Sequence, residues 1–440
     1  MASTRAWSDL PVQLQSALLK LPSLFATDSQ FQAFANTLEN EDHFTFGVKS
    51  AGADKTWAII LIRVSKSKTL ASIGSYEDAL FTLSALPQQW EEFFKAVPLA
   101  PYQSYWGLLG LNNKQKGVEI LGDEMAFWKF APFWRRALEL LHDAHCGPIK
   151  AEEEPETEED HIVGRYIYAN VPIWGRSKIF YEQSGTGNQD IVFLHTAGAD
   201  SRQYHGVMNN PEMRRKCNMI AFDLPGHGRS FPTEKLPPGT HTTTEDSYVG
   251  AITAMVKALK PNKPIICGAS MAGQVCLAVA IRADEVGAGG TIPLQGCDYL
   301  HMERQSHDRS PNINQSLFNA ELAYGMMSPT APLKNRQLIW HLYSSQAYGI
   351  FHGDLDFYFG GWDGRSRVGN IDTKKCPVYM LTGEYDWSNT PAMAQATCEK
   401  IPGAKHKTML QLGHFPATEN PGRFVPYLVE AIEHIQGTRE

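Results

Sequence analysis

The sequence predicts an α/β protein that carries a smaller α+β domain at its N-terminal end. Three observations lead to this prediction. Downstream of about residue 162, short apolar runs rich in β-branched residues alternate with stretches of helical length, as in a parallel sheet covered by helices. Upstream, strand and helix signals follow a different order. An acidic segment at 147–161 separates the two, so we predict domains at 1–146 and 162–440.

The composition limits the classes of function. The chain has 440 residues, of which 43% are hydrophobic and 20% charged, so it is globular and long enough for two separate cores. A net charge of −7 argues against nucleic acid or an anionic membrane surface as a partner. No apolar run reaches the roughly 18–20 residues that span a bilayer. Neither end carries a signal core or a retention tag.

The cysteines indicate a reducing compartment. There are seven, an odd number, and Cys267, Cys276 and Cys376 lie within or beside apolar runs. This usage is typical of buried free thiols, so the expected location is cytoplasmic. Neither a C-x-x-C nor an H-E-x-x-H motif occurs. We therefore expect no metal and no cofactor.

The N-terminal domain begins with helical signals and continues with strands. Leucine and phenylalanine recur at helical spacing over 12–21 and 30–38. Strands are predicted at 44–48, 56–64, 69–73, 79–83 and 117–123. Further helices are predicted at 87–95 and 124–142.

The helix predicted at 124–142 is aromatic on much of its surface, so it must be buried on more than one side. A curled antiparallel sheet closed by such a helix resembles the sterol-carrier-protein-like fold, over roughly residues 30–145. The resemblance rests on Asp78 to Leu83 and on the glycine-bounded stretch Gly117 to Asp123 before the helix. It implies a domain able to hold an apolar ligand. Two interpretations stay open for one group of aromatic residues, which either form an ordinary core or line a lipid tunnel or a domain interface: Tyr102, Tyr105, Trp106, Trp128 and Trp134.

The segment 147–161 contains seven acidic groups and no large apolar residue beyond Ile149. Like charges repel, and nothing in the segment can be buried. It is therefore predicted to be a solvated linker.

The C-terminal domain contains a series of short apolar strands. They are predicted at 165–171, 178–183, 190–194, 219–222, 264–267, 291–294, 377–381 and 407–412. The fifth of these leads through Gly268 into a turn with Ser270 at its apex, and an apolar helix follows. A serine held there projects its hydroxyl above the sheet, in a backbone geometry that leaves no room for bulky neighbours. Ala272 stands where a second glycine is usual, with Gly273 one place later.

Partners for this serine follow other predicted strands. His195 to Ala199 is a loop of small residues that can bring a backbone N–H close to a carbonyl oxygen. Downstream, Thr382 to Asp386 and then Gly413 to Pro416 supply an acid and a late histidine, His414. In open parallel sheets, such groups collect at the carboxyl ends of the strands. The order of serine, acid and histidine is that of a nucleophile with its base and orienting acid.

Five motifs in register carry a resemblance to the α/β-hydrolases over residues 163–440. They are H-x-x-G at 195–198, D-x-P-G-H-G-x-S at 223–230, the serine turn, G-x-x-D at 383–386 and G-H-F-P at 413–416. The resemblance implies that Ser270, Asp386 and His414 are catalytic, with Asp386 favoured over Glu384 as the acid. It places the oxyanion hole at the backbone N–H groups of Met271 and Ala197. Two residues depart from the glycines that are usual in the family motifs: Thr196 and Ala272. Both are expected to narrow the oxyanion region.

The resemblance also implies a role for the insertion between the strands at 291–294 and 377–381. In this family such an insertion is a cap over the serine, here about 298–375, with helices predicted at 313–325 and 333–348. Its aromatic residues imply a bulky, mostly apolar substrate. The predicted substrate contacts are His195, Arg202, Tyr343, Tyr348, Phe351 and Trp362.

The sequence thus predicts a cytoplasmic serine hydrolase that cleaves an ester, lactone or related carbonyl bond of a small molecule through an acyl-enzyme on Ser270. The same triad could serve a carbon–carbon bond hydrolase, an acyltransferase or a lyase. An alternative of another class is a lipid-binding carrier with a vestigial hydrolase domain. A homo-oligomer is compatible with the sequence, because the aromatic residues at 101–134 exceed what one small domain readily buries.

Overall fold

The computed structural model describes residues 12–40, 42–50, 59–66, 68–110, 114–155, 159–303 and 306–439. The chain divides into two compact units. Unit 1 comprises residues 1–151 together with 310–325, and unit 2 comprises 152–309 together with 326–440. Each unit therefore contains its own sheet and its own core.

Unit 2 is built on an eight-stranded sheet with the strand order β13-β12-β11-β10-β8-β9-β7-β6. The strands from β8 onward pair in parallel, whereas β6 and β7 pair antiparallel at one edge. The strands are β6 (Val163–Val171), β7 (Gly175–Ser184), β8 (Gln189–Leu194), β9 (Cys217–Phe222), β10 (Ile265–Ala269), β11 (Gly290–Leu294), β12 (Tyr379–Gly383) and β13 (Lys405–Met409). All eight strands predicted for this domain are present.

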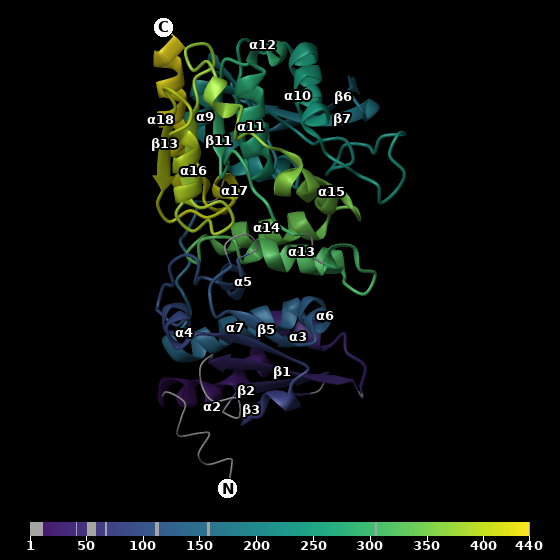
Figure 1. Ribbon diagram of the computed structural model, residues 1–440, viewed down its shortest axis with the longest axis vertical. Coiled ribbons are helices and arrows are strands. Elements are labelled where there is room, and N and C mark those ends of the chain that lie inside the picture. The colour runs from purple at the N-terminus through teal and green to yellow at the C-terminus, as the bar shows by residue number, and fades with distance from the viewer. Residues whose placement is uncertain are drawn as a thin grey trace. The chain divides into compact units, whose positions relative to one another are not determined.

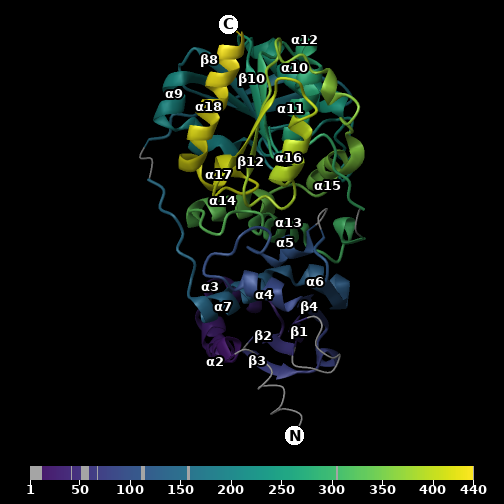
Figure 2. The ribbon, with the colours of Figure 1, turned by 60° about the vertical axis from the view of Figure 1, so that its left-hand side comes forward.

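Helices cover both faces of this sheet, which explains why its central strands are apolar along their whole length. Helix α18 (Pro421–Arg439) packs Phe424, Leu428 and Ile432 onto one face. These residues recur at helical spacing, so one side of the helix is apolar. Figures 1 and 2 show α18 on one side of the sheet and α10 (Glu245–Leu259) and α11 (Met271–Ile281) on the other.

The remaining helices of unit 2 are short. They are α8 (His205–Met208), α9 (Pro211–Lys216), α12 (Ala283–Val286), α14 (Leu333–Ser344), α15 (Ile350–Asp356), α16 (Pro391–Cys398) and α17 (Pro416–Glu419). Single turns lie at η2 (Ser201–Tyr204), η3 (Ser306–Arg309), η4 (Phe357–Gly361) and η5 (Val368–Asn370). Helix α14 begins at the residue predicted for it, whereas α15 was not predicted as a helix.

Unit 1 contains a five-stranded sheet with the order β3-β2-β1-β4-β5. Its strands are β1 (His43–Ser50), β2 (Ile59–Ser65), β3 (Thr69–Gly74), β4 (Phe81–Ala85) and β5 (Glu119–Gly122). The predicted sheet was antiparallel throughout, but β1 and β4 pair in parallel. The chain therefore returns to the sheet beside its first strand. The start of the strand predicted at 56–64 lies outside the described residues.

The helices of unit 1 are α2 (Val12–Thr27), α3 (Ser29–Ala35), α4 (Pro87–Phe93), α5 (Tyr105–Leu109), α6 (Glu124–Lys129), α7 (Ala131–Cys146) and α13 (Gln315–Tyr324), with a single turn at η1 (Tyr76–Asp78). The long helix predicted at 124–142 is in fact two helices, α6 and α7, which meet at Phe130. Pro132 lies in the first turn of α7, where its missing N–H leaves no hydrogen bond unmade.

Helix α13 completes the aromatic core of unit 1, although it comes from the insertion predicted to be a cap. Phe318 of this helix packs edge-on against Trp106 and Trp128, with ring centroids 5.8 and 5.6 Å apart. The Ser104 hydroxyl donates to the Gly325 carbonyl at 2.8 Å. The prediction that residues 298–375 act as one cap is therefore wrong at 310–325. The aromatic surplus of the first domain is buried because a distant segment covers it.

The acidic segment also departs from its predicted role as a solvated linker. The Glu152 N–H donates to the Thr330 carbonyl at 2.7 Å, and its carboxylate accepts from Arg423 and Asn420. These partners all belong to unit 2. The part of the segment around Glu152 is therefore held by specific hydrogen bonds and an ion pair, which the number of acidic residues alone does not predict.

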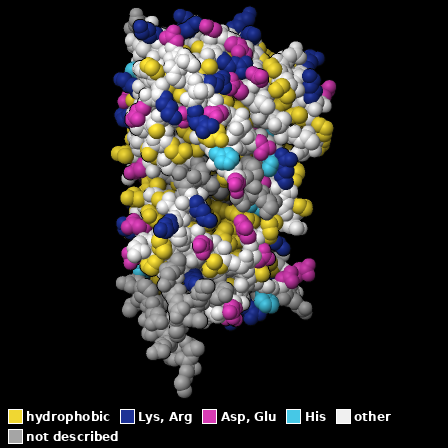
Figure 3. Space-filling model, viewed as in Figure 1, with side chains coloured by type: hydrophobic (Ala, Val, Ile, Leu, Met, Phe, Trp, Pro, Cys, Tyr) yellow, Lys and Arg dark blue, Asp and Glu magenta, His cyan; other side chains and the backbone are white. Residues whose placement is uncertain are grey.

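None of the helices in the described part of the chain combines the length and the apolar character needed to cross a bilayer. On the face drawn in Figure 3, acidic and basic side chains are interspersed. That face presents no field of a single sign to a polyanionic partner.

A buried ion pair inside unit 1 leads to a prediction for its stability. The Arg135 guanidinium contacts the Glu321 carboxylate of α13 and also bonds Glu139 at 2.6 Å, with Arg135 4% and Glu321 0% exposed. Glu321→Gln should destabilise the protein by about 3–5 kcal/mol, because it leaves a buried charge under-compensated. Urea unfolding followed by tryptophan fluorescence measures this.

The double variant Arg135→Met/Glu321→Leu is the control, since apolar residues of similar size can replace a buried pair at little cost. It should recover most of the lost stability. Equal destabilisation in both variants would show that the pair is not what makes α13 part of unit 1.

Candidate active site

Ser270 occupies the apex of the turn between β10 and α11. Its backbone lies at φ 61° and ψ −122°, a conformation that side-chain-bearing residues rarely adopt. The Ser270 N–H donates to the Leu294 carbonyl of β11 at 2.9 Å, which ties the turn to the neighbouring strand. The serine is 4% exposed. The turn is held in the strained geometry expected of a nucleophile.

Two glycines make this turn possible. A Cβ at Gly268 would lie too close to Ala272 and Leu194. A Cβ at Gly273 would collide with the Leu294 carbonyl and with Gly296. The second position that must be glycine is therefore Gly273, one place after Ala272.

Asp386 and His414 lie together beyond the ends of β12 and β13. The Asp386 Oδ2 atom accepts from Nδ1–H of His414 at 2.8 Å, and both side chains are buried. This bond leaves Nε2 as the ring nitrogen free to take a proton. The second oxygen of Asp386 accepts from the N–H groups of Ser388 and Asn389 at 2.8 and 3.0 Å. Glu384, the rival acid, instead accepts from the Gln411 N–H.

The loop after β8 contains, in the predicted oxyanion motif, a backbone donor for which the described part of the chain provides no acceptor. The Thr196 N–H is taken by Gln203 at 2.9 Å, and the Gly198 N–H by Asp354 at 2.8 Å. Between them, the Ala197 N–H has no acceptor among the described residues. The same is true of Met271, because the first residue of a helix has no intrahelical acceptor. These are the two N–H groups predicted to form the oxyanion hole.

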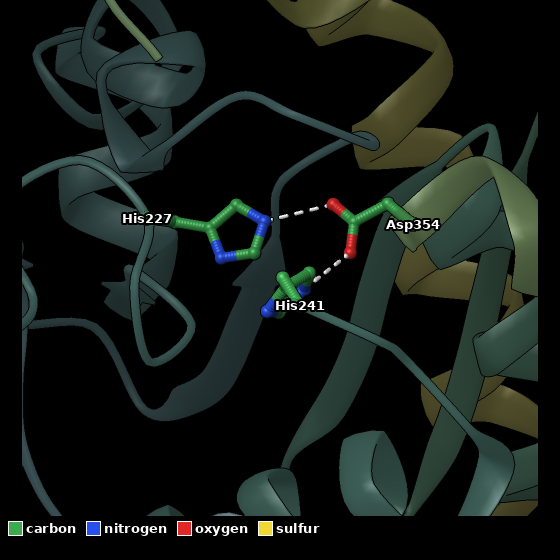
Figure 4. Close-up of side chains that lie close together, drawn as sticks. All are labelled: His227, His241 and Asp354. Atoms are coloured by element: carbon green, nitrogen blue, oxygen red, sulfur yellow. Dashed lines mark hydrogen bonds and ion pairs between the residues drawn. The ribbon is translucent and has the colours of Figure 1, made fainter. Parts of the chain in front are cut away.

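Asp354 of α15 lies at the centre of a buried polar cluster (Figure 4). Its oxygens accept from Nε2 of His227 at 2.8 Å and Nε2 of His241 at 3.0 Å. They also accept from the Thr243 hydroxyl and from the Gly198 N–H. Burial alone would raise the pKa of Asp354, but the two histidines hold it well below its ordinary value. Asp354 in turn raises the pKa of His227, so both shifts favour a charged pair.

His227, His241 and Asp354 are also a group whose ligand atoms lie within 4.8 Å of one another. Two imidazoles and a carboxylate are a donor set that transition metals accept. Here, however, Asp354 already accepts four hydrogen bonds, including one from backbone. A metal would have to displace these donors, so the cluster is complete as an ion-pair network.

Comparison with known proteins shows the family of this chain and its fold. A model of the alpha/beta hydrolase family matches residues 191–426, more than half of the chain. The protein belongs to the alpha/beta hydrolase family. A thermophilic esterase from Thermogutta terrifontis has a similar solved structure, with a TM-score of 0.51 and 18% identity, covering 62% of this chain and 99% of the esterase. This likeness shows a shared fold.

Two curated proteins match shorter stretches. The dihydrolipoyllysine-residue acetyltransferase component of the acetoin cleaving system from Pseudomonas putida is 32% identical over 108 residues, 24% of this chain and 27% of that protein. The Pimeloyl-[acyl-carrier protein] methyl ester esterase of Nitrosomonas europaea is 28% identical over 112 residues, 25% of this chain and 38% of its own length. Both matches thus span less than two fifths of the relative.

Both ring nitrogens of His195 bond to backbone groups, while its contact with a substrate stays a prediction. Its Nε2 accepts from the Leu224 N–H at 3.0 Å, so the proton is on Nδ1, which donates to the Thr196 carbonyl at 2.8 Å. Burial and the neighbouring His227 both lower the pKa of His195. With both nitrogens used by backbone, the ring fixes the oxyanion loop to the turn after β9.

The predicted substrate contacts divide into two groups. Tyr343, Phe351 and Phe415 form an aromatic cluster. The Tyr343 ring centroid lies 5.5 Å from that of Phe351 and 5.5 Å from that of Phe415, the residue after His414. The Tyr343 hydroxyl bonds that of Thr196 at 2.6 Å, so this cluster borders the oxyanion loop.

The other predicted contacts have different surroundings, and their role toward a substrate stays a prediction. Tyr348 is 57% exposed. Trp362 donates to Glu245 of α10 at 2.8 Å. Arg202 is held by Asp200 at 2.6 Å and lines a polar cavity of about 150 Å³ that contains none of the triad residues.

Two buried acids around this site were not predicted from the sequence: Asp354 and Glu419. Their partners are remote in the chain or are backbone groups, so no local motif marks them. The one available signal was the apolar setting of Asp354 and Glu419, since buried acids are uncommon unless paired.

Replacing Asp354 should destabilise the protein strongly. Asp354→Asn leaves His227 without its charge partner and sets an amide N–H against a histidine N–H, so we expect a loss of about 3–5 kcal/mol. Denaturant unfolding measures it. Asp356→Asn in the same helix is the control, because that side chain is 42% exposed, and its effect should stay within about 0.5 kcal/mol. Similar losses in both variants would contradict the role of the buried pair.

Glu419 leads to a prediction that the stability of the protein depends on pH. It is fully buried and accepts from the N–H groups of Ser328 and Gly413, the latter next to His414. Burial raises its pKa to about 8, above the ordinary value near 4.5. The folded protein therefore binds a proton more tightly than the unfolded chain, and stability from this group is lost as pH rises from about 4.5 to 8.

We expect wild-type stability to fall by a few kcal/mol across this pH range through Glu419 alone. Glu419→Gln should flatten the dependence, because an amide does not titrate. Unfolding free energies at pH 5, 6.5 and 8 for both proteins measure the difference. Parallel pH profiles would contradict the assignment.

Proposed function

We propose that this protein is a serine hydrolase that cleaves a carbonyl ester by acyl transfer through Ser270. The observation that supports this most is the combination of a serine in a strained strand-to-helix turn with a histidine whose Nδ1–H is bonded to a buried carboxylate. The bond to Asp386 fixes the imidazole so that Nε2 can act as a base. Histidine suits this task because an ordinary imidazole has a pKa near 6.5.

In the proposed reaction, the Ser270 hydroxyl attacks the carbonyl carbon while His414 takes its proton. The negative oxygen that forms would be bound by the N–H groups of Met271 and Ala197, each donor contributing roughly 3–4 kcal/mol to the stabilisation of the transition state. His414 then returns the proton to the leaving alcohol. Water repeats these steps on the acyl-enzyme and releases the acid.

The substrate is proposed to be a small molecule with an apolar acyl or alcohol group. The aromatic cluster of Tyr343, Phe351 and Phe415 borders the oxyanion loop, and it offers mainly apolar surface. The esterase named among the curated relatives is consistent with an ester as the scissile group. All seven cysteines are free thiols, which supports a reducing, cytoplasmic location.

A fluorophosphonate probe tests the proposal. It should form one adduct, located on Ser270 by peptide mass spectrometry. Heat-denatured protein is the control and should not react. Reaction at another serine, or equal reaction before and after denaturation, would overturn the acyl-enzyme mechanism.

A second candidate is acyl transfer to an acceptor other than water. The match to an acetyltransferase component favours it, because that relative transfers an acyl group by its printed name. The acyl-enzyme would be the same in both cases. Adding a thiol or an alcohol during turnover separates them: a hydrolase releases mainly the acid, whereas a transferase gives the thioester or new ester and turns over faster.

A further inference from the structure

The turn η4 brings a buried tyrosine to the nucleophile, and the proposed mechanism does not use it. Tyr358 is 2% exposed. Its carbonyl accepts from Nε2 of Gln274 at 3.2 Å. Gln274 lies one helical turn after Ser270, on the helix that begins at the nucleophile. This bond fixes the backbone of Tyr358 close to the site.

The hydroxyl of Tyr358 lies near the hydroxyls of Ser270 and Ser388. It is buried, yet no neighbour in the described part of the chain forms a hydrogen bond of ordinary geometry with it. Burial raises its pKa well above the ordinary value, as does the nearby Asp386, so the phenol stays protonated and remains a donor. A buried hydroxyl without a partner costs about 1–3 kcal/mol, so such groups usually meet an acceptor in the functional state.

The strand order places this hydroxyl on one side of the serine. Ala197 follows β8, which lies on one side of β10. Cys297, Asp386 and Ser388, which lie near the Tyr358 hydroxyl, follow β11 and β12 on the other side. His414 follows β13, farther along the same side. The phenol therefore lies with the groups that move the proton, apart from the Ala197 donor of the oxyanion hole.

We propose that Tyr358 donates a hydrogen bond to the leaving-group oxygen of the ester. This inference rests on the proposed serine hydrolase function. When the tetrahedral intermediate collapses, the bond between the carbonyl carbon and this oxygen breaks, and the electron pair stays on the oxygen. His414 gives that oxygen its proton, while Tyr358 keeps its own proton and stabilises the developing charge. Tyr358 thereby accelerates most the cleavage of esters whose alcohol is a poor leaving group.

Tyr358→Phe in the full-length protein tests the proposal with two esters of one acid, ethyl butyrate and p-nitrophenyl butyrate. For the ethyl ester, kcat/KM should fall about 10- to 100-fold, as for the loss of a hydrogen bond to a charged group. For the p-nitrophenyl ester it should fall less than about threefold, since p-nitrophenolate leaves without this help. The rate of fluorophosphonate labelling should also change less than about threefold, because fluoride leaves without this hydrogen bond as well.

Tyr379→Phe is the matched control, because it removes another largely buried phenol whose hydroxyl bonds Glu430 at 2.8 Å. It should leave the ratio of the two esters unchanged. If Tyr358→Phe lowered kcat/KM equally for both esters and also slowed labelling, Tyr358 would have a packing or oxyanion role and the proposal would be overturned. An unchanged kcat/KM for both esters would overturn it as well. Absence of Ser270 labelling in the unmutated protein would instead overturn the proposed function, and this inference with it.

Discussion

Ser270→Ala is expected to lower ester turnover by about 10⁴- to 10⁶-fold, the largest effect of any single change in this protein. The alanine keeps the Cβ of the strained turn, so the N–H bond to Leu294 and the packing of α11 should persist. What is lost is the atom that forms the covalent bond. The residual rate comes from binding and the oxyanion donors alone. Initial rates on p-nitrophenyl butyrate measure the loss.

Ser388→Ala is the comparison for this experiment. Ser388 is also buried and lies on the loop that carries Asp386. Its truncation removes a serine hydroxyl other than that of the nucleophile. Its effect should stay below about tenfold. If Ser270→Ala kept more than about 1% of wild-type turnover, the acyl-enzyme mechanism would have to be abandoned.

The sheet of unit 2 could be predicted because each strand carries its own signal. Runs such as Ile191 to Leu194 are apolar on both faces, and small residues follow them where the chain must turn. The turn around Ser270 could be predicted for the same reason, since it needs small residues at fixed offsets within a few positions. Local rules were sufficient there.

The role of the insertion could not be predicted in the same way. Its length indicated a cap, and its helices α13 and α14 lie close to their predicted positions. An apolar helix face, however, does not specify what covers it. Phe318 and Glu321 have their partners in α5, α6 and α7, more than 180 residues earlier in the chain. Only the three-dimensional arrangement shows that α13 belongs to unit 1.

The same limit applies to the residues that surround the triad. Asp354 bonds Gly198, His227 and His241, which lie 113 to 156 residues away along the chain. Its own neighbours in sequence give no sign of this. The ring of the histidine in the H-x-x-G motif bonds the backbone of Thr196 and of Leu224, and the motif does not specify the second of these partners. Motifs located the chemistry, but they did not identify the residues that hold it in place.

Asp386→Asn is expected to reduce kcat/KM by about 10⁴-fold while the fold is kept. The asparagine oxygen can still accept from the N–H groups of Ser388 and Asn389. Its NH₂ group, however, would then face Nδ1 of His414 at the place where the carboxylate now accepts a hydrogen bond. That contact favours the tautomer with the proton on Nε2, and this nitrogen can then no longer take the proton of Ser270.

Glu384→Gln is the matched control, since it makes the same chemical change two residues away. The Glu384 carboxylate accepts a hydrogen bond from the Gln411 N–H, and a glutamine side-chain oxygen can accept the same bond. Its kcat/KM should stay within about threefold of wild type. Unfolding free energies for both variants check that any loss is chemical. A larger loss for Glu384→Gln than for Asp386→Asn would assign the orienting acid to Glu384, against the 2.8 Å bond between Asp386 and His414.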